Sequence, residues 1–403
     1  MTKGFFKSGH FPTLFSAFLY FDISFMIWVM LGPLGVHIAR TLGLNPAEKG
    51  LMVAIPILAG ALLRIPMGLL VDRIGPKWTG LIGQSIVIFS LGWGWLTVVG
   101  TKSDVYAMGV LLGVAGASFA VALPMASRWY PPEHQGLALG IAGAGNSGTV
   151  LSALLAPRLA EAFGWEAVFG FALIPATLTL IAYMLLAKDS PECPPPQKLS
   201  NYLNVLRDAD TWWFCFFYFV TFGGFVGLAS SLVIYFHDQY GIVPVMAGNL
   251  TALCVFAGSL FRPLGGLMAD RIGGIRSLQI LYVVVALSMG AASFAPDSLY
   301  SAVFIFLVGL AAMGMGNGSV FQLVPQRFRK EVGVMTGLVG CTGGIGGFYL
   351  ASSLGFSKQW TGDYSAGFLI FAGLAVLALM GIWVVKTRWR TTWGSAAVTT
   401  ARI

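Results

Sequence analysis

The chain has 403 residues, of which 57% are apolar and only 10% are Asp, Glu, Lys or Arg. Soluble globular domains carry about 25% charged residues, so this composition excludes an ordinary soluble protein. It also excludes a disordered chain, because disordered segments are poor in apolar residues. The 52 glycines and 30 phenylalanines are typical of helices packed closely in lipid. The composition therefore predicts an all-α protein that crosses the membrane many times.

Crossing the hydrocarbon core takes about 20 apolar residues as a helix. Twelve candidate spans follow one another, at residues 13–39, 50–71, 78–100, 105–127, 136–157, 165–187, 211–236, 246–269, 276–295, 299–324, 333–354 and 364–385. The N-terminus runs into an apolar stretch too long for a signal-peptide core, so we expect a retained first span. The cysteines are widely spaced and predict neither a disulfide framework nor a thiolate metal site, and no cofactor is expected.

The basic residues predict the orientation of these spans. The termini and the even-numbered loops hold 17 of the 24 Lys and Arg residues. By the positive-inside rule both termini are then cytoplasmic, and the protein is a multi-pass protein of the cytoplasmic (inner) membrane. The net charge of +8 is explained by this topology, so no nucleic-acid partner is expected.

A proline-rich segment at 188–210, with an amphipathic piece at 201–210, is the only substantial break. It predicts an N-terminal half (1–187), a cytoplasmic linker (188–210) and a C-terminal half (211–403). The halves resemble each other, because residues 59–75 and 257–273 match at 10 of 17 positions, including Arg64 with Arg262. We therefore expect two pseudo-symmetric six-helix halves with a substrate site between them at the bilayer midplane.

The stretch GLLVDRIGPK (68–77), echoed by GLMADRIGGIR (266–276), resembles a loop signature of the major facilitator superfamily, which implies the major-facilitator fold. Asp72 and Asp270 fall at cytoplasmic helix ends. Their expected partners are Arg128 for the first and Arg327 or Arg329 for the second. Such pairs lock one conformation and break in the other, and the alternative is a purely topological anchor. The predicted gating residues are Asp72, Arg73, Arg128, Asp270, Arg271 and Arg327.

Two arginines, Arg64 and Arg262, fall inside spans, where each costs roughly 2.5–3.5 kcal/mol. One alternative is pairing with backbone carbonyls or with Asp22, the one acid inside a span. Two guanidiniums that face one cavity repel each other unless an anion lies between them. Guanidinium makes planar, two-pronged hydrogen bonds to oxyanions. The pair therefore predicts a cavity that binds a small oxyanion.

Two spans are rich in glycine, which gives a smooth face on which helices approach and slide, although generic packing explains such a face equally well. The predicted sliding glycines are Gly140, Gly143, Gly145, Gly148, Gly340, Gly343, Gly344, Gly346 and Gly347. Asn146, within the first set, places an amide at membrane depth.

These residues resemble the nitrate/nitrite porter (NarK-like) branch of the superfamily. The similar stretches are GAGNSG (143–148), GCTGGIGG (340–347), YFVTFGGF (218–225) and GASFAVALP (116–124). The resemblance implies the anion ligands Arg64 and Arg262, the polar contacts Asn146 and Tyr218, and the aromatic walls Phe119 and Phe222. Lipid-facing or core packing is the alternative for the two rings. Span 11 departs from the pattern because no Asn repeats Asn146, and Asn317 is a possible substitute.

The expected function is transport of nitrate, with nitrite as a second possible substrate, by alternating access in a monomer within the lipid bilayer. Asp22 lies about nine residues into the first span and is the candidate for proton coupling. Its alternatives are a place near the interface or neutralisation of an arginine. Nitrate/proton symport is favoured over nitrate/nitrite exchange. Another small anion, such as a carboxylate, would use the same arginines. A membrane enzyme is not expected, because motifs such as HExxH and paired intramembrane carboxylates do not occur, and a sensor would need a longer soluble segment.

Overall fold

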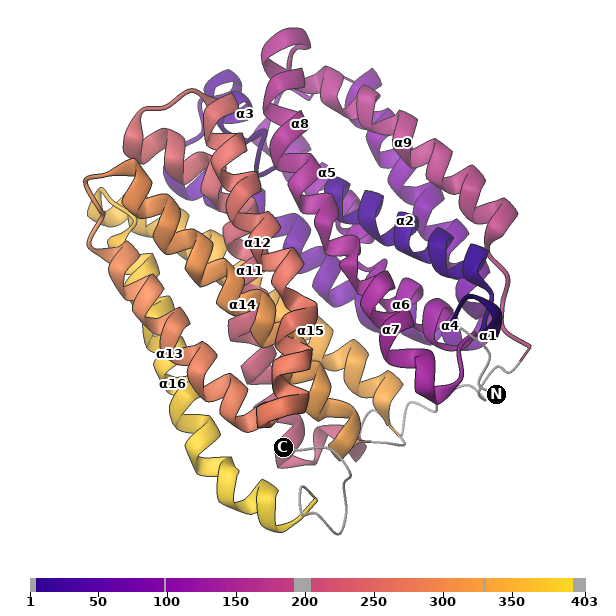
Figure 1. Ribbon diagram of the computed structural model, residues 1–403. Helices are drawn as coiled ribbons and strands as arrows, with labels where there is room; N and C mark the ends of the chain where they lie inside the picture. The colour runs from indigo at the N-terminus through magenta and orange to yellow at the C-terminus, as the bar shows by residue number, and fades with distance from the viewer. Residues whose placement is uncertain (1–4, 98, 192–203, 329–330, 394–403) are drawn as a thin grey trace.

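The computed structural model describes residues 5–97, 99–191, 204–328 and 331–393, which form helices and no strands. Before the linker, the helices are α1 (Phe5–Ser8), α2 (Phe11–Trp28), α3 (Gly35–Leu42), α4 (Pro46–Leu96), α5 (Lys102–Gly116), α6 (Phe119–Ser127), α7 (Pro132–Gly143), the 3₁₀ turn η1 (Ala144–Ser147), α8 (Gly148–Phe163) and α9 (Trp165–Leu186). After it come α11 (Ala209–Tyr240), α12 (Pro244–Ile272), α13 (Gly274–Ser293), α14 (Leu299–Arg327), α15 (Val332–Thr361) and α16 (Ser365–Thr391). The two sets gather on opposite sides of the bundle (Figure 1).

Eleven helical segments in the described ranges are long and apolar enough to cross a membrane. The longest, α4, holds both predicted spans 50–71 and 78–100, because Gly75 interrupts it with φ 85° and ψ 157°. The predicted all-α membrane fold is therefore confirmed, and the eleven segments account for twelve crossings.

The internal repeat is visible in the backbone. Gly75 has φ 85°, and its counterpart Gly273, between α12 and α13, has φ 96° and ψ 140°. Only glycine adopts this region readily. The same residue type in the same rare conformation therefore reverses the chain between spans 2 and 3 and between spans 8 and 9, as expected for duplicated halves.

Three predicted spans are not continuous α-helices. Span 1 breaks after Trp28 and resumes at Gly35, span 4 breaks between α5 and α6, and span 5 passes through η1. The hydropathy pattern does not detect these breaks, because the interrupting residues are mostly small or apolar. The amphipathic piece at 201–210 lies partly outside the described residues, and α11 already begins at Ala209.

The two sets of helices meet along α4 with α15 and along α8 with α12. Small residues bring them close, because a Cβ on Gly344 would lie 2.5 Å from the Ala61 Cβ, and a Cβ on Gly50 would lie 2.8 Å from the Gly355 Cα. We call the end of the bundle with Asp72, Arg128 and Arg327 the linker end. The opposite end, with Pro46 and Tyr240, is the far end.

Candidate functional site

Arg64, on α4, is fully buried at the contact between the halves. Its Nε donates to the Gly116 carbonyl (3.2 Å), and its Nη1 donates to the Gly340 carbonyl of the other half. Its Nη2 has no hydrogen-bond partner in the described structure, and none of the ion pairs found there includes Arg64. The backbone carbonyls named as an alternative thus satisfy part of the guanidinium and leave one nitrogen uncommitted.

Aromatic rings enclose this guanidinium. Its Cζ lies 5.0 Å from the Phe119 ring centroid, 5.1 Å from that of Phe222 and 5.4 Å from that of Trp28. Cation–π attraction at this range stabilises a desolvated arginine. Both predicted aromatic residues therefore lie beside Arg64, and Trp28 is a third ring that the sequence did not single out.

Arg262, on α12, approaches the same region from the C-terminal half. It interacts electrostatically with Arg64 and with the buried Tyr218 hydroxyl. Its Nη1 is buried, and neither this atom nor the Tyr218 hydroxyl makes a hydrogen bond of good geometry within the described ranges. Arg64 and Arg262 thus each keep one buried guanidinium nitrogen without a hydrogen-bond partner in the described structure, as an anion site requires.

Phe321, on α14, is a further ring beside these residues, and the sequence did not predict it. It meets Tyr218 edge-on at 5.0 Å and Phe119 at 6.1 Å, while Tyr218 stacks on Phe222 at 5.0 Å. No periodicity singles out Phe321 among 30 phenylalanines. The five rings Trp28, Phe119, Tyr218, Phe222 and Phe321 are called the ring group below.

The glycines of α15 make room for this group. A Cβ on Gly343 would lie 2.5 Å from the Tyr218 ring and 3.0 Å from Phe222, and one on Gly340 would lie 3.2 Å from Arg64 Nη1. Gly346 and Gly347 pack equally closely on Phe219 and Val226 of α11. These residues therefore have a packing role in this conformation.

The two asparagines are buried but stand apart from these contacts. Asn146 in η1 is 1% exposed with its Oδ1 unpartnered, and Asn317 on α14 is 1% exposed with both amide atoms unpartnered in the described structure. No contact found in the described ranges joins Asn146 to either arginine. The Asn146 Oδ1 and both amide atoms of Asn317 are therefore the polar atoms that a ligand or water could still satisfy.

Asp22 is buried on α2 and does not neutralise an arginine. Its Oδ1 accepts a hydrogen bond from the Ser147 hydroxyl at 2.7 Å. It is 8% exposed, so it lies inside the bundle. None of the ion pairs found in the described ranges joins Asp22 to an arginine, which disagrees with the alternative that it neutralises one.

At the linker end, Arg128 Nη2 lies 2.9 Å from Asp72 Oδ1, as the motif predicted. Of the two partners predicted for Asp270, Arg327 is wrong, and a pair with Arg329 stays a prediction. Arg327 binds Asp208 (2.5 Å) and Asp210 (2.8 Å) in place of Asp270, and Arg329 lies outside the described residues. Asp210 also binds Arg388, so Arg327 and Arg388 both pair with acidic residues at the start of α11. Arg73, Asp270 and Arg271 are exposed.

Comparison with known proteins identifies the family of this chain. Residues 14–351 match the Major Facilitator Superfamily. The chain is 33% identical over 362 residues to the Nitrite extrusion protein of Bacillus subtilis (strain 168), covering 89% of this chain and 91% of the relative. It is 34% identical over 363 residues to the Probable nitrate/nitrite transporter NarK2 of Mycobacterium tuberculosis (strain ATCC 25618 / H37Rv), covering 88% and 91%.

A solved structure of the xylose transporter XylE from E. coli, in a partially occluded inward open conformation, superposes with a TM-score of 0.75 at 13% identity. It covers 94% of this chain and 99% of that chain, and at this identity it supports the fold alone. The matches confirm the resemblance drawn from the sequence and identify a transporter and not an enzyme. The chain belongs to the nitrate/nitrite porter (NarK-like) family of the Major Facilitator Superfamily.

Proposed function

We propose that this protein transports nitrate across the cytoplasmic membrane by alternating access, with Arg64 and Arg262 binding the anion between the two halves. The observation that carries the proposal is Arg64, a fully buried cation that has no acidic partner among the described residues and keeps one nitrogen unbonded there. Burying a charge is costly unless it is paired, so an anion that completes the site gains strong, charge-assisted hydrogen bonds.

The ring group favours a small, flat ion. The rings of Phe119 and Phe222 lie about 5 Å from the Arg64 Cζ and leave little width beside it. Nitrate is planar, so its edge meets the guanidiniums while rings cover its faces. The relatives named above are nitrate or nitrite transporters by name, which supports nitrate and nitrite over a carboxylate.

Asp22 is the candidate for coupling transport to protons. Nitrate uptake against a negative-inside potential costs about 2.3 kcal/mol per unit charge per 100 mV, so it needs a driving force. Asp22 is the buried carboxylate of α2, and it has no cationic partner among the ion pairs of the described ranges. A carboxylate without a fixed cation is free to gain and lose a proton during the cycle.

Exchange of nitrate for nitrite is the second candidate function. The contacts found for Asp22 do not reach either arginine, and an exchanger needs no titratable group at the anion site. A relative from Thermus thermophilus, 29% identical over 396 residues, is named a probable nitrate/nitrite antiporter.

The test uses purified protein in sealed liposomes that contain a pH-sensitive dye, with the membrane potential held near zero. Symport predicts that added nitrate acidifies the lumen, that Asp22→Asn abolishes this signal, and that the exposed control Glu161→Gln keeps it. Nitrate uptake without a pH change, and only into vesicles loaded with nitrite or nitrate, would show exchange instead. Transport of formate or acetate as fast as nitrate would overturn the choice of substrate.

A further inference from the structure

Span 5 changes its helical geometry at the residue proposed to contact the anion. The α-helix ends at Gly143, residues Ala144–Ser147 form η1, and α8 begins at Gly148. A 3₁₀ stretch inside a longer helix often marks a functional hinge. Asn146 lies in this stretch, buried and with its Oδ1 unpartnered.

The next residue, Ser147, faces two acceptors with one proton. Its Oγ lies 2.7 Å from Asp22 Oδ1 and 2.8 Å from the Ala144 carbonyl oxygen. A hydroxyl donates one hydrogen bond, and an ionised carboxylate is the stronger acceptor. When Asp22 is ionised, Ser147 therefore donates to Asp22. When Asp22 is protonated, its own O–H donates to Ser147 Oγ, and the Ser147 proton turns to the Ala144 carbonyl.

This change of hydrogen-bond partner takes place within η1, because Ala144 and Ser147 are the first and last residues of the turn that contains Asn146. The turn is pressed against α2, since a Cβ on Gly145 would lie 2.6 Å from the Phe21 ring and one on Gly148 would clash with the Asp22 carbonyl. It also packs against α12, which carries Arg262. The turn therefore has little freedom to drift away from either helix.

Three arginines on or next to the helices around α2 have other partners in the described ranges. Arg64 on α4 bonds to carbonyl oxygens, Arg128 after α6 pairs with Asp72, and Arg158 on α8 donates to Asn249. In the described ranges, the Ser147 hydroxyl is the group found to hydrogen-bond to the Asp22 carboxylate.

We propose that Ser147 is a positioning residue that transmits the protonation state of Asp22 to Asn146 and so sets the affinity for nitrate. The inference rests on the proposed function, because it assumes that Asp22 takes up the coupled proton and that Asn146 contacts the anion.

The experiment compares Ser147→Ala and Ser147→Thr with the wild type in proteoliposomes, with KM for nitrate and the maximal rate measured from acidic to neutral pH. We expect KM of the wild type to change about fivefold or more across this range, a typical size for coupling between two sites. Ser147→Ala should flatten the KM profile, and Ser147→Thr, which keeps the hydroxyl, should restore it. The matched control is Ser152→Ala, which removes a buried, unpartnered hydroxyl one turn further along α8.

A wild-type KM profile in Ser147→Ala overturns the role of Ser147, and it leaves symport intact if nitrate still acidifies the lumen. Absence of acidification in the wild type overturns symport itself, so the two failures are distinguishable. If Ser147→Ala is not recovered folded, Ser147→Cys replaces it. That variant keeps the size with a weaker donor, and an unchanged KM profile there also overturns the inference.

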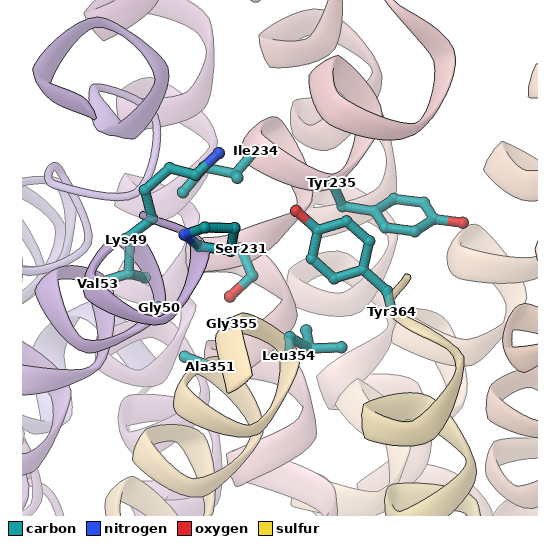
Figure 2. A pocket seen from close by; sticks show the side chains of 11 residues that line it. Lys49, Gly50, Val53, Ser231, Ile234, Tyr235, Ala351, Leu354, Gly355 and Tyr364 are labelled. Atoms are coloured by element: carbon teal, nitrogen blue, oxygen red, sulfur yellow. The ribbon is translucent and has the colours of Figure 1, made fainter. Parts of the chain in front are cut away.

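A separate observation concerns the far end of the bundle. Lys49, in the first turn of α4, lies 2.6 Å from Asp238 near the end of α11, and the Tyr364 hydroxyl donates to the same carboxylate oxygen at 2.9 Å. Lys49 and Tyr364 extend from opposite halves around a cavity of about 20 Å³ (Figure 2). The ion pair is mostly buried, with side-chain exposures of 15% and 16%.

Of the ion pairs found in the described ranges, Lys49–Asp238 is the one that joins the two halves. Glu48–Lys102 and Asp72–Arg128 lie within the N-terminal half, and the pairs of Asp208 and Asp210 lie within the C-terminal half. Close backbone contacts of Gly50 with Gly355 accompany it. The far end is therefore closed in this structure.

Glycines toward the linker end are in a different environment. Added Cβ atoms at Gly140, Gly143, Gly333 and Gly337 would meet nothing within 4 Å. Close glycine contacts between the halves are therefore found at the far end, and these four glycines make none.

We infer that Lys49, Asp238 and Tyr364 form a latch that holds the far end closed and must break in each transport cycle.

Spin labels at the exposed positions Thr41 and Val243, on opposite halves of the far end, measure its opening in the full-length protein. We expect Lys49→Gln and Asp238→Asn each to raise severalfold the fraction of molecules in which the two spin labels lie far apart. The double swap Lys49→Asp with Asp238→Lys should reverse most of that change. The control is Lys102→Gln, whose pair with Glu48 stays within one half. Distance distributions in Lys49→Gln and Asp238→Asn equal to that of the wild type overturn the latch.

Discussion

Arg64 is the residue that indicates an anion site most strongly, because it is fully buried and its Nη2 has no partner in the described structure. The internal repeat was enough to predict Arg64 and Arg262 from the sequence, because chance rarely places a buried arginine at equivalent positions of two apolar helices. Trp28 and Phe321 were not predictable in this way. Their contacts depend on the packing of α2 and α14, and ring residues are too common in this chain for a pattern to single them out.

Replacing Arg64 or Arg262 by lysine tests the site directly. Lysine keeps the charge but loses the planar fork, so we expect nitrate transport to fall by about tenfold to 100-fold, since hydrogen bonds to charged groups contribute about 1.5–3 kcal/mol. Nitrate uptake into proteoliposomes measures the change. Arg40→Lys, an exposed position on α3 that belongs to neither the predicted anion site nor the predicted gating residues, should leave uptake unchanged. Normal transport in both Arg64→Lys and Arg262→Lys would contradict the anion site.

At the scale of elements, the glycines of the two glycine-rich spans lie in two different environments, although the sequence pattern around them is the same. Gly343 and Gly346 are closely packed by rings or backbone, whereas Gly140 and Gly143 face open space. Composition predicts a smooth helix face, but only the packed structure shows which part of that face is in contact. The role of the open glycines in sliding stays a prediction.

Gly343→Ala and Gly337→Ala form a matched pair on α15. The first adds a methyl group 2.5 Å from the Tyr218 ring, and the second adds one where nothing lies within 4 Å. We expect Gly343→Ala to weaken nitrate binding severalfold by displacing Tyr218, and Gly337→Ala to leave the affinity unchanged. Binding to detergent-purified protein measures both, and equal affinities would show that Tyr218 does not contribute to the site.

Charge pairs at the element ends were predicted only in part. Asp72 and Arg128 followed from a local motif next to a helix end. Asp210 was assigned to the linker, although it binds Arg327 and Arg388, which are 117 and 178 residues away. Pairing over such separations depends on how α11, α14 and α16 pack together, and no local pattern contains that information.

For the whole molecule, the distribution of basic residues predicts which end faces the cytoplasm. With the linker end cytoplasmic, Lys102 lies outside the cell and Thr391 lies inside, and both are exposed. In otherwise cysteine-free protein, Lys102→Cys should react with an impermeant thiol reagent on intact cells, and Thr391→Cys should react only after permeabilisation. The opposite labelling pattern would reverse the orientation.

The hydrogen bond from Arg64 to Gly340 also bears on the proposed transport cycle. Arg64 belongs to the first half and its Nη1 donates to the Gly340 carbonyl of the second, so this bond ties the two halves together beside the proposed anion site. Under the proposed function, rotation of the halves breaks this bond, and an anion that replaces the carbonyl satisfies the same nitrogen. We therefore expect anion binding to lower the cost of the rotation, which discourages cycling without cargo.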